Sequence, residues 1–223
     1  MDDRLREELG IEELRARFLE YTREAFRRTP SGDRPRILEV GCGRGPSMLE
    51  LASLTKGEIV GIDLDGDALH DLERRIEQED LSHRLTTVLC SLFDTGFADG
   101  AFDVVWEEGV LHLLDIRKSL GECSRLLKHR GHLVMAETTE WFESKREALP
   151  EFGFDLLERI PWRSGCWWTD YYAPLEERIQ RLRETGGDSE QLEALRRYED
   201  EVERVKADPD RSDTGHFVLR KTG

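Results

Sequence analysis

The sequence predicts an α/β fold in which a doubly wound, mainly parallel sheet is covered by helices on both faces. Two observations lead to this prediction. Short apolar runs typical of buried strands alternate with amphipathic helical patterns over residues 37–137, and this alternation is typical of parallel sheets. The first run, at residues 37–40, leads directly into the glycine cluster GCGRG at residues 41–45, where such sheets place their ligands.

The predicted elements follow in order along the chain. Apolar residues at mostly helical spacing predict one amphipathic helix over residues 4–28, ending near Thr29-Pro30. Strands are then expected at 37–40, 58–63, 85–90, 102–106 and 132–137, with helices at 47–54, 68–78 and 116–127. After Trp141 the rhythm changes, and two strands at 154–159 and 216–220 are separated by an insertion with helices at 174–184 and 189–206.

The inserted segment concentrates aromatic side chains. Five of them fall within eleven positions: Trp162, Trp167, Trp168, Tyr171 and Tyr172. The helices of the insertion are too polar to build a core of their own, and such a cluster must be buried against some surface. We therefore expect residues 160–212 to form a lid over the carboxyl edge of the sheet. Simple packing of the insertion onto the sheet is the alternative for each ring.

The overall composition limits the classes of partner. The formal net charge is -15, which argues against nucleic acid and anionic membranes as main partners. The four cysteines are widely spaced without a CxxC pair, so we expect neither a metal site nor a disulfide framework. No apolar run suits a signal peptide or a membrane span, so we expect a cytoplasmic protein, with its oligomeric state left open.

The glycine cluster suits one of two nucleotide-like cofactors. Asp63 ends the second predicted strand, where a carboxylate accepts hydrogen bonds from ribose hydroxyls. This arrangement fits either a nicotinamide dinucleotide or S-adenosylmethionine. Dinucleotide sites typically use GxGxxG, whereas this chain has GxGxG with Glu39 two residues before it. Glu39 would repel a pyrophosphate but not a sulfonium or an ammonium group, which favours S-adenosylmethionine.

Four motifs, ILEVGCGRG, GIDLD, FADGAFDVVW and SRLLKHRGHLVMAE, together resemble the motif series of class I S-adenosylmethionine-dependent methyltransferases over residues 36–138. The resemblance implies a seven-stranded sheet whose last strand, at 216–220, is antiparallel. It also implies S-adenosylmethionine as the cofactor and S-adenosylhomocysteine as its product. The expected organisation is one methyltransferase domain over 1–223, with an N-terminal helix at 1–30, a cofactor-binding core at 34–159, the helical lid at 160–212 and the last strand at 213–223.

The resemblance further implies a set of cofactor-binding residues. The set is Glu39, Gly41, Cys42, Gly43, Asp63, Leu64, Ser91, Leu92 and Glu107. Glu39 and the glycines would surround the methionine part, Asp63 would bind the ribose, and Leu64 would pack on the adenine. Ser91 stands where many members of the family have an aspartate, so we expect backbone groups to contribute to adenine binding there.

Three further stretches, WEEGVLH, AETTEWF and CWWTDYYAP, are similar to a small-molecule branch of the family, the methyltransferase type 11-like enzymes. This similarity points to Trp141, Trp168 and Tyr172 as residues that contact the substrate. Glu108 and His112 are the candidate catalytic residues, because either side chain can orient an acceptor or take its proton. The alternatives are a capping role for Glu108 and a simple core hydrogen bond for His112.

Two absences narrow the acceptor. The chain has no Asn/Asp-Pro-Pro-aromatic motif after the fourth strand, and no cysteine follows a proline, although the enzymes that methylate nucleic-acid bases carry such motifs. We therefore predict in-line methyl transfer to a small molecule, with the accepting atom (N, O, S or C) left open. The rival interpretations are a non-catalytic S-adenosylmethionine-binding sensor and, less favoured, a nicotinamide-dependent oxidoreductase.

Overall fold

The computed structural model describes residues 3–186, 189–208 and 213–222 of the chain. The chain divides into two compact units. The sheet unit comprises Glu20–Pro161 and Gly215–Gly223, and the helical unit comprises Met1–Leu19 and Trp162–Thr214. Parts of the predicted elements lie outside the described residues: 1–2 of the N-terminal helix, 187–188 and 209–212 of the lid, and 223 of the last strand.

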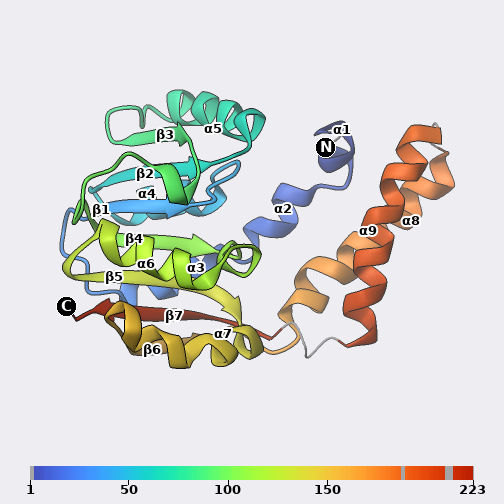
Figure 1. Cartoon of the computed structure of the whole chain (residues 1–223). Coiled ribbons are helices and arrows are strands. Elements are labelled where there is room, and N and C mark those ends of the chain that lie inside the picture. The colour runs from blue at the N-terminus through green and yellow to red at the C-terminus, as the bar shows by residue number, and fades with distance from the viewer. Residues whose placement is uncertain (1–2, 187–188, 209–212, 223) are drawn as a thin grey trace. The chain divides into compact units, whose positions relative to one another are not determined.

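The sheet unit is built on one seven-stranded sheet (Figure 1). Its strands are β1 (Arg36–Val40), β2 (Glu58–Asp63), β3 (Leu85–Leu89), β4 (Phe102–Glu108), β5 (Leu127–Thr138), β6 (Phe154–Pro161) and β7 (Thr214–Lys221). They lie in the order β3-β2-β1-β4-β5-β7-β6, with the first five in this order paired in parallel and β7 antiparallel to β6. The predicted doubly wound, mainly parallel sheet with an antiparallel last strand is confirmed.

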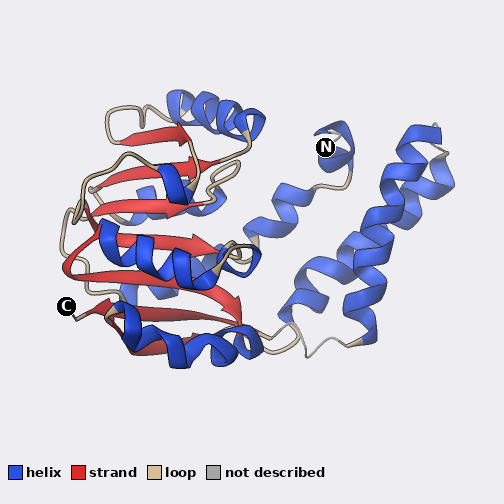
Figure 2. Cartoon of the chain, in the orientation of Figure 1, coloured by secondary structure: helices blue, strands red, loops and turns tan. Residues whose placement is uncertain are grey.

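Helices cover both faces of this sheet (Figure 2). They are α3 (Leu19–Arg28), α4 (Pro46–Leu54), α5 (Gly66–Gln78), α6 (Ile116–Leu126) and α7 (Thr139–Lys145), with short turns η1 (Leu92–Asp94), η2 (Leu111–Leu113) and η3 (Arg146–Phe152). Side chains alternate across a strand, so Ile37 and Val104 pack with α3, α4 and α5 on one face. Leu38 and Val105 pack with α6, α7 and η3 on the other.

The N-terminal segment differs from the single helix predicted over residues 4–28. It forms α1 (Asp3–Glu8), α2 (Ile11–Ala16) and then α3. Gly10 has φ = +59°, a left-handed conformation that interrupts a helix. Arg178 stabilises this interruption by donating to the carbonyl oxygens of Leu9 and Gly10 at 3.0 and 3.1 Å. Apolar spacing cannot reveal such a break, because the stabilising residue lies 168 positions away.

Five rings of the helical unit lie close to one another, and we call them the aromatic cluster: Phe18, Trp162, Trp167, Tyr171 and Tyr172. The Phe18 ring centroid lies 4.4 Å from that of Trp167 and 5.4 Å from that of Trp162. The insertion was expected to lack a core of its own, but the N-terminal segment supplies Phe18 and the rings bury one another. The other elements of this unit are a π-helical turn η4 (Trp167–Tyr172), α8 (Ala173–Thr185) and α9 (Ser189–Ala207).

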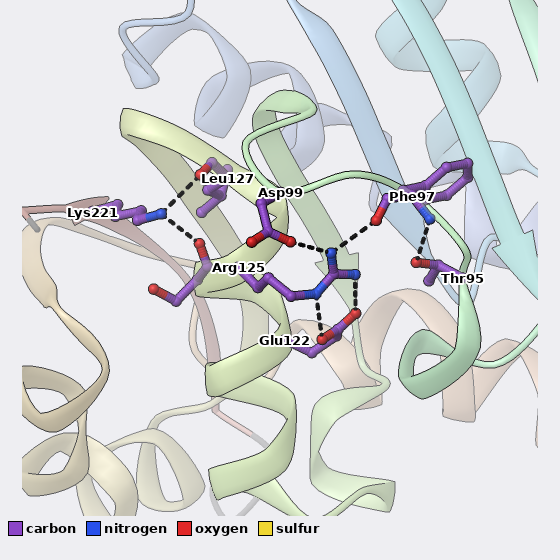
Figure 3. Close-up of polar contacts among 8 residues, drawn as sticks. Thr95, Phe97, Asp99, Glu122, Arg125, Leu127 and Lys221 are labelled. Atoms are coloured by element: carbon purple, nitrogen blue, oxygen red, sulfur yellow. Dashed lines mark hydrogen bonds and ion pairs between the residues drawn. The ribbon is translucent and has the colours of Figure 1, made fainter.

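A polar network lies where β4 and β5 begin and β7 ends (Figure 3). Arg125 donates to the Phe97 carbonyl oxygen at 2.8 Å and to Asp99 at 2.7 Å, which ties the loop before β4 to the end of α6. Lys221 of β7 donates to the Leu127 carbonyl oxygen at 2.9 Å, at the first residue of β5. The network therefore holds the edge of the sheet opposite the carboxyl ends of the parallel strands.

Candidate active site

The turn after β1 has the open backbone that a closely bound ligand requires. Gly41 and Gly43 have φ values of +70° and +51°, which strongly favour glycine. A Cβ atom added at Gly41 would lie 2.4 Å from Cγ2 of Val110, whereas one added at Gly43 would meet only Oδ2 of Asp63, at 3.9 Å, within the described residues. The backbone at Gly43 therefore faces open space.

Asp63 ends β2 beside this turn. Its Oδ2 accepts a hydrogen bond from the Gly43 amide at 2.7 Å, and its Oδ1 accepts one from the Asp65 amide at 2.9 Å. Leu64, the next residue, is 73% exposed, although its side chain is large and apolar. The structure thus brings Gly43, Asp63 and Leu64 together at the carboxyl edge of the sheet, as the sequence predicts.

Glu39 lies buried in β1 directly before the glycine turn. Ser47 donates to its Oε1, but its Oε2 is buried and has no hydrogen-bond partner among the described residues. Burial, with smaller contributions from the charges of Glu108 and Asp63, outweighs the Ser47 bond and raises the pKa of Glu39 to about 8. A buried carboxylate oxygen without a partner is costly and offers a place for a cationic or hydrogen-bond-donating ligand group.

Three other predicted cofactor residues surround the same edge. The Ser91 hydroxyl accepts from the Phe93 amide at 3.2 Å and caps η1, in which Leu92 is buried. Cys42 is buried between the two glycines, and burial raises the pKa of its thiol. A thiol in this state is unreactive, and the contact of Cys42 with the cofactor stays a prediction.

Glu107 lies near the end of β4, directly before Glu108. Its side chain is fully buried, and Oε2 accepts from the amides of Val110 and Leu111 at 2.9 and 3.3 Å. Burial and the charge of Glu137 raise the pKa of Glu107 well above its usual range. Glu107 thus supports the turn after β4 through these two amides, and its contact with the cofactor stays a prediction.

Glu108 is anchored through one oxygen. Oε1 accepts from the Thr22 hydroxyl at 2.8 Å and the Trp106 indole at 3.0 Å, and it lies 3.3 Å from Nε2 of His216. Burial opposes ionisation of Glu108, but the hydrogen bond and charge of His216 outweigh it and lower the pKa of this carboxyl. Within the described residues Oε2 accepts no hydrogen bond, so a carboxylate oxygen stays available.

His112 lies in η2, directly after β4, and pairs with a residue that the sequence analysis missed. Its Nδ1 lies 3.0 and 3.2 Å from the two carboxylate oxygens of Glu137, at the end of β5. The His112 side chain is 42% exposed, whereas that of Glu137 is 3% exposed. The exposed ring is therefore held by a buried carboxylate.

The three predicted substrate residues fall in both units. Trp141 is half-buried on α7 of the sheet unit, and its amide donates to the hydroxyl of Thr138, the N-cap of α7, at 3.3 Å. Trp168 and Tyr172 belong to η4 of the helical unit. The Tyr172 hydroxyl donates to Glu201 at 2.9 Å, and burial raises the pKa of Tyr172. Tyr172 therefore has a structural partner of its own.

The described ranges hold no group of three His, Cys, Asp or Glu side chains that could bind a metal ion. Over the same ranges, no helix combines the length and the apolar character needed to cross a membrane.

Residues 38–135, which contain β2 to β4, the glycine turn and most of β1 and β5, match the family model for a methyltransferase domain. This part of the chain is a class I S-adenosylmethionine-dependent methyltransferase domain. The family resemblance predicted from the motifs is confirmed for this part of the chain.

Relatives of known name extend the match beyond the methyltransferase domain. An O-methyltransferase, rstn1, of Aspergillus nomiae is 30% identical over 117 residues, which are 52% of either chain. An O-methyltransferase, resE, of Aspergillus sclerotiorum is 28% identical over 167 residues, 74% of this chain and 59% of its own. This chain therefore spans less than two thirds of the length of these relatives.

A solved structure shares the fold. The phosphoethanolamine N-methyltransferase 2 of Haemonchus contortus, in complex with phosphomonomethylethanolamine and S-adenosylhomocysteine, superposes with a TM-score of 0.69 at 19% identity. The match covers 90% of this chain and 52% of that one.

The methyltransferase domain also fits its cofactor on observations of its own. S-adenosylmethionine offers an ammonium group, two ribose hydroxyls and a flat adenine ring. The buried, unpaired Oε2 of Glu39 suits the ammonium group, and the Asp63 carboxylate suits the ribose hydroxyls. The exposed Leu64 side chain suits the adenine ring. The open backbone at Gly43 leaves room for a ligand beside the Asp63 carboxylate.

Proposed function

We propose that this protein transfers a methyl group from S-adenosylmethionine to a small-molecule acceptor. The observation that carries the proposal is the unpaired, buried Oε2 of Glu39 beside the open glycine turn of a methyltransferase domain. Bound S-adenosylmethionine supplies a methyl group on a positively charged sulfur. Glu39 would hold the ammonium group, Asp63 the ribose and Leu64 the adenine, and these contacts would position the methyl group.

The acceptor is proposed to be a small molecule. The named relatives rstn1 and resE are O-methyltransferases, and the formal net charge of -15 disfavours a nucleic-acid substrate. Transfer of a methyl group depends chiefly on positioning the acceptor and excluding water. Trp141 on α7 and the rings of the helical unit are proposed to supply this enclosure. A cytoplasmic location belongs to the same proposal.

The alternative with most support is a non-catalytic S-adenosylmethionine sensor, because cofactor binding does not require turnover. Ionisable groups favour the enzyme: Glu108 keeps a carboxylate oxygen available and His112 is exposed at the same sheet edge. A screen of phenols, carboxylic acids, amines and thiols with trideuteromethyl S-adenosylmethionine, read by mass spectrometry, separates the two. Methylation of an acceptor supports the enzyme, whereas cofactor binding with no product supports the sensor.

Asp63→Asn is expected to weaken S-adenosylhomocysteine binding by roughly 1.5–3 kcal/mol, the scale of a hydrogen bond to a charged group. Titration calorimetry measures this loss. The matched control is Asp65→Asn, since Asp65 caps α5 through the Asp67 and Ala68 amides and belongs to no proposed ligand contact. Equal affinity in folded Asp63→Asn and wild-type protein would remove Asp63 from the cofactor site.

Trp168→Ala is expected to raise the acceptor KM by about tenfold, the loss of a ring contact worth about 1–1.5 kcal/mol, while cofactor affinity stays nearly constant. Arg181→Ala, an exposed substitution on α8, is the control. Hydrogen exchange of residues 162–186 should slow further when cofactor and acceptor are both bound. Identical exchange with and without ligands, together with normal turnover of Trp168→Ala, would contradict the lid.

A further inference from the structure

The turn after β4 is held by the buried carboxyl groups of two residues, Glu107 and Glu137. Glu107 accepts hydrogen bonds from the amides of Val110 and Leu111, and Glu137 accepts one from the amide of His112 at 3.0 Å. Three consecutive amides are thus bound by side chains of the neighbouring strands β4 and β5. So complete a set of backbone contacts fixes the position of the His112 Cα atom.

The ring of His112 is oriented as firmly as its backbone. Nδ1 lies within 3.2 Å of both Glu137 oxygens, and a carboxylate in this position selects the tautomer that carries its proton on Nδ1. Nε2 then holds a free lone pair. Within the described part of the chain Nε2 makes no hydrogen bond, and the side chain is 42% exposed. The arrangement leaves one basic nitrogen open to a ligand.

This nitrogen belongs to the same edge of the sheet as the glycine turn. Val110, two residues before His112, lies so close to Gly41 that a Cβ atom there would be 2.4 Å from its Cγ2. Gly109, with φ = +77°, lets the chain reverse direction after β4, and its Cβ position lies 4.0 Å from Cε1 of His112. The His112 turn therefore packs directly against the proposed methionine-binding loop.

We propose that His112 is the general base of methyl transfer, that Glu137 is its positioning residue, and that the acceptor is a hydroxyl group, phenolic or enolic. The inference rests on the proposed function and narrows its acceptor. The hydroxyl oxygen forms its bond to the methyl carbon while the S–CH3 bond breaks and leaves its electron pair on sulfur. The hydroxyl proton passes to Nε2 of His112, and the Glu137 carboxylate stabilises the charge on the ring.

The chemistry of the acceptor explains why such a pair points to a hydroxyl. A neutral amine attacks with its own lone pair and loses its proton afterwards, so it needs no base during the attack. A phenol has a pKa near 10 and is a poor nucleophile until its proton leaves. A histidine oriented by a buried carboxylate meets this need, because proton removal in the transition state contributes about 10²–10⁴-fold to a rate.

The first test measures the tautomer of the His112 ring and needs no turnover. In ¹⁵N-labelled protein with S-adenosylhomocysteine bound, the His112 ring should show a protonated Nδ1 and an unprotonated Nε2 by NMR. Glu137→Gln should shift the ring toward the other tautomer, whereas Glu140→Gln, an exposed substitution on α7, should not. An unprotonated Nδ1 in the wild type, or the same tautomer in Glu137→Gln, would overturn the positioning role.

The second test identifies which class of acceptor is methylated. It uses trideuteromethyl S-adenosylmethionine and a panel of phenols, enols, amines and thiols. The expected products are methyl ethers. His112→Gln and Glu137→Gln should lower kcat for weakly acidic phenols by about 100-fold with cofactor affinity unchanged, and should lose little with nitrophenols that are already ionised. Products from amines or thiols alone would overturn the hydroxyl assignment. No product from any class would instead contradict the proposed function, while the NMR result still reports on the pair.

Discussion

Glu39→Gln is expected to weaken S-adenosylhomocysteine binding by about 100-fold, or about 2.7 kcal/mol. The reason is the buried Oε2, which has no partner among the described residues. Truncating one member of a buried, hydrogen-bonded charge pair costs about 2–5 kcal/mol. Glu58→Gln, on an exposed carboxylate of β2, is the matched control. Unchanged affinity in Glu39→Gln would exclude Glu39 from the binding of the ammonium group.

The raised pKa of Glu39 predicts that the same substitution, although it weakens ligand binding, does not destabilise the free protein at high pH. Its folded pKa is raised from 4.5 to about 8, so its contribution to stability is present below about pH 4.5 and is lost as pH rises to about 8. Glu39→Gln lacks this loss and should be at least as stable as wild type at about pH 9. Binding of the ligand ammonium favours the ionised carboxylate, so binding by wild type should release a proton below about pH 8.

Calorimetry in buffers of different ionisation enthalpy measures that proton. Affinity of the wild type should rise with pH between about 5 and 8 and then level off, and Glu39→Gln should lack this part of the pH dependence. A pure packing role for Glu39 predicts neither the proton release nor the gain in stability at high pH. The two results together therefore separate a ligand-binding carboxylate from a structural one.

Glu108→Gln is expected to lower methyl transfer by at least about tenfold and to destabilise the protein by about 1–3 kcal/mol. An amide can still accept from Thr22 and Trp106, but it loses the charge interaction with His216. Chemical denaturation and steady-state rates measure the two effects.

A double-mutant cycle with His216→Gln tests whether the loss arises from this pair. The losses caused by Glu108→Gln and His216→Gln should be clearly non-additive in the double variant, because contacting residues show interaction energies of about 0.5–3 kcal/mol. Wild-type rates in Glu108→Gln would return Glu108 to a structural role. Additive losses would mean that His216 acts independently of Glu108.

Most of the sheet unit could be predicted from local pattern. The strand over Glu58–Asp63 follows from a run of apolar residues. The turn at Gly41 to Gly45 follows from three glycines, which adopt positive φ easily. Both signals lie within a few positions of the sequence. The N-terminal segment could not be predicted in the same way. Its interruption depends on Arg178 and its last ring, Phe18, packs with Trp167, and both partners are distant in sequence.

In the candidate site, too, residues that belong to a local motif could be predicted, and residues with partners distant in sequence could not. Asp63 and Gly43 follow from motif spacing, since Asp63 ends β2 and Gly43 lies in the turn after the adjacent parallel strand β1. Glu137 was missed because its partner lies 25 positions earlier, and His216 because it lies 108 positions after Glu108. The two amide contacts of Glu107 could not be predicted either, because alternation along β4 turns its side chain toward the opposite face from Glu108 and the turn that it meets has no sequence signature of its own.

The place of β7 has a consequence for how the protein is made. β7 is the last strand along the chain, yet it lies between β5 and β6. Until β7 has inserted, both of those strands keep an unpaired edge, the kind of surface on which nascent chains aggregate. β7 also brings His216 to Glu108. Closing the sheet and completing this part of the site are therefore a single event, so a chain that fails to insert its last strand is both inactive and prone to aggregate.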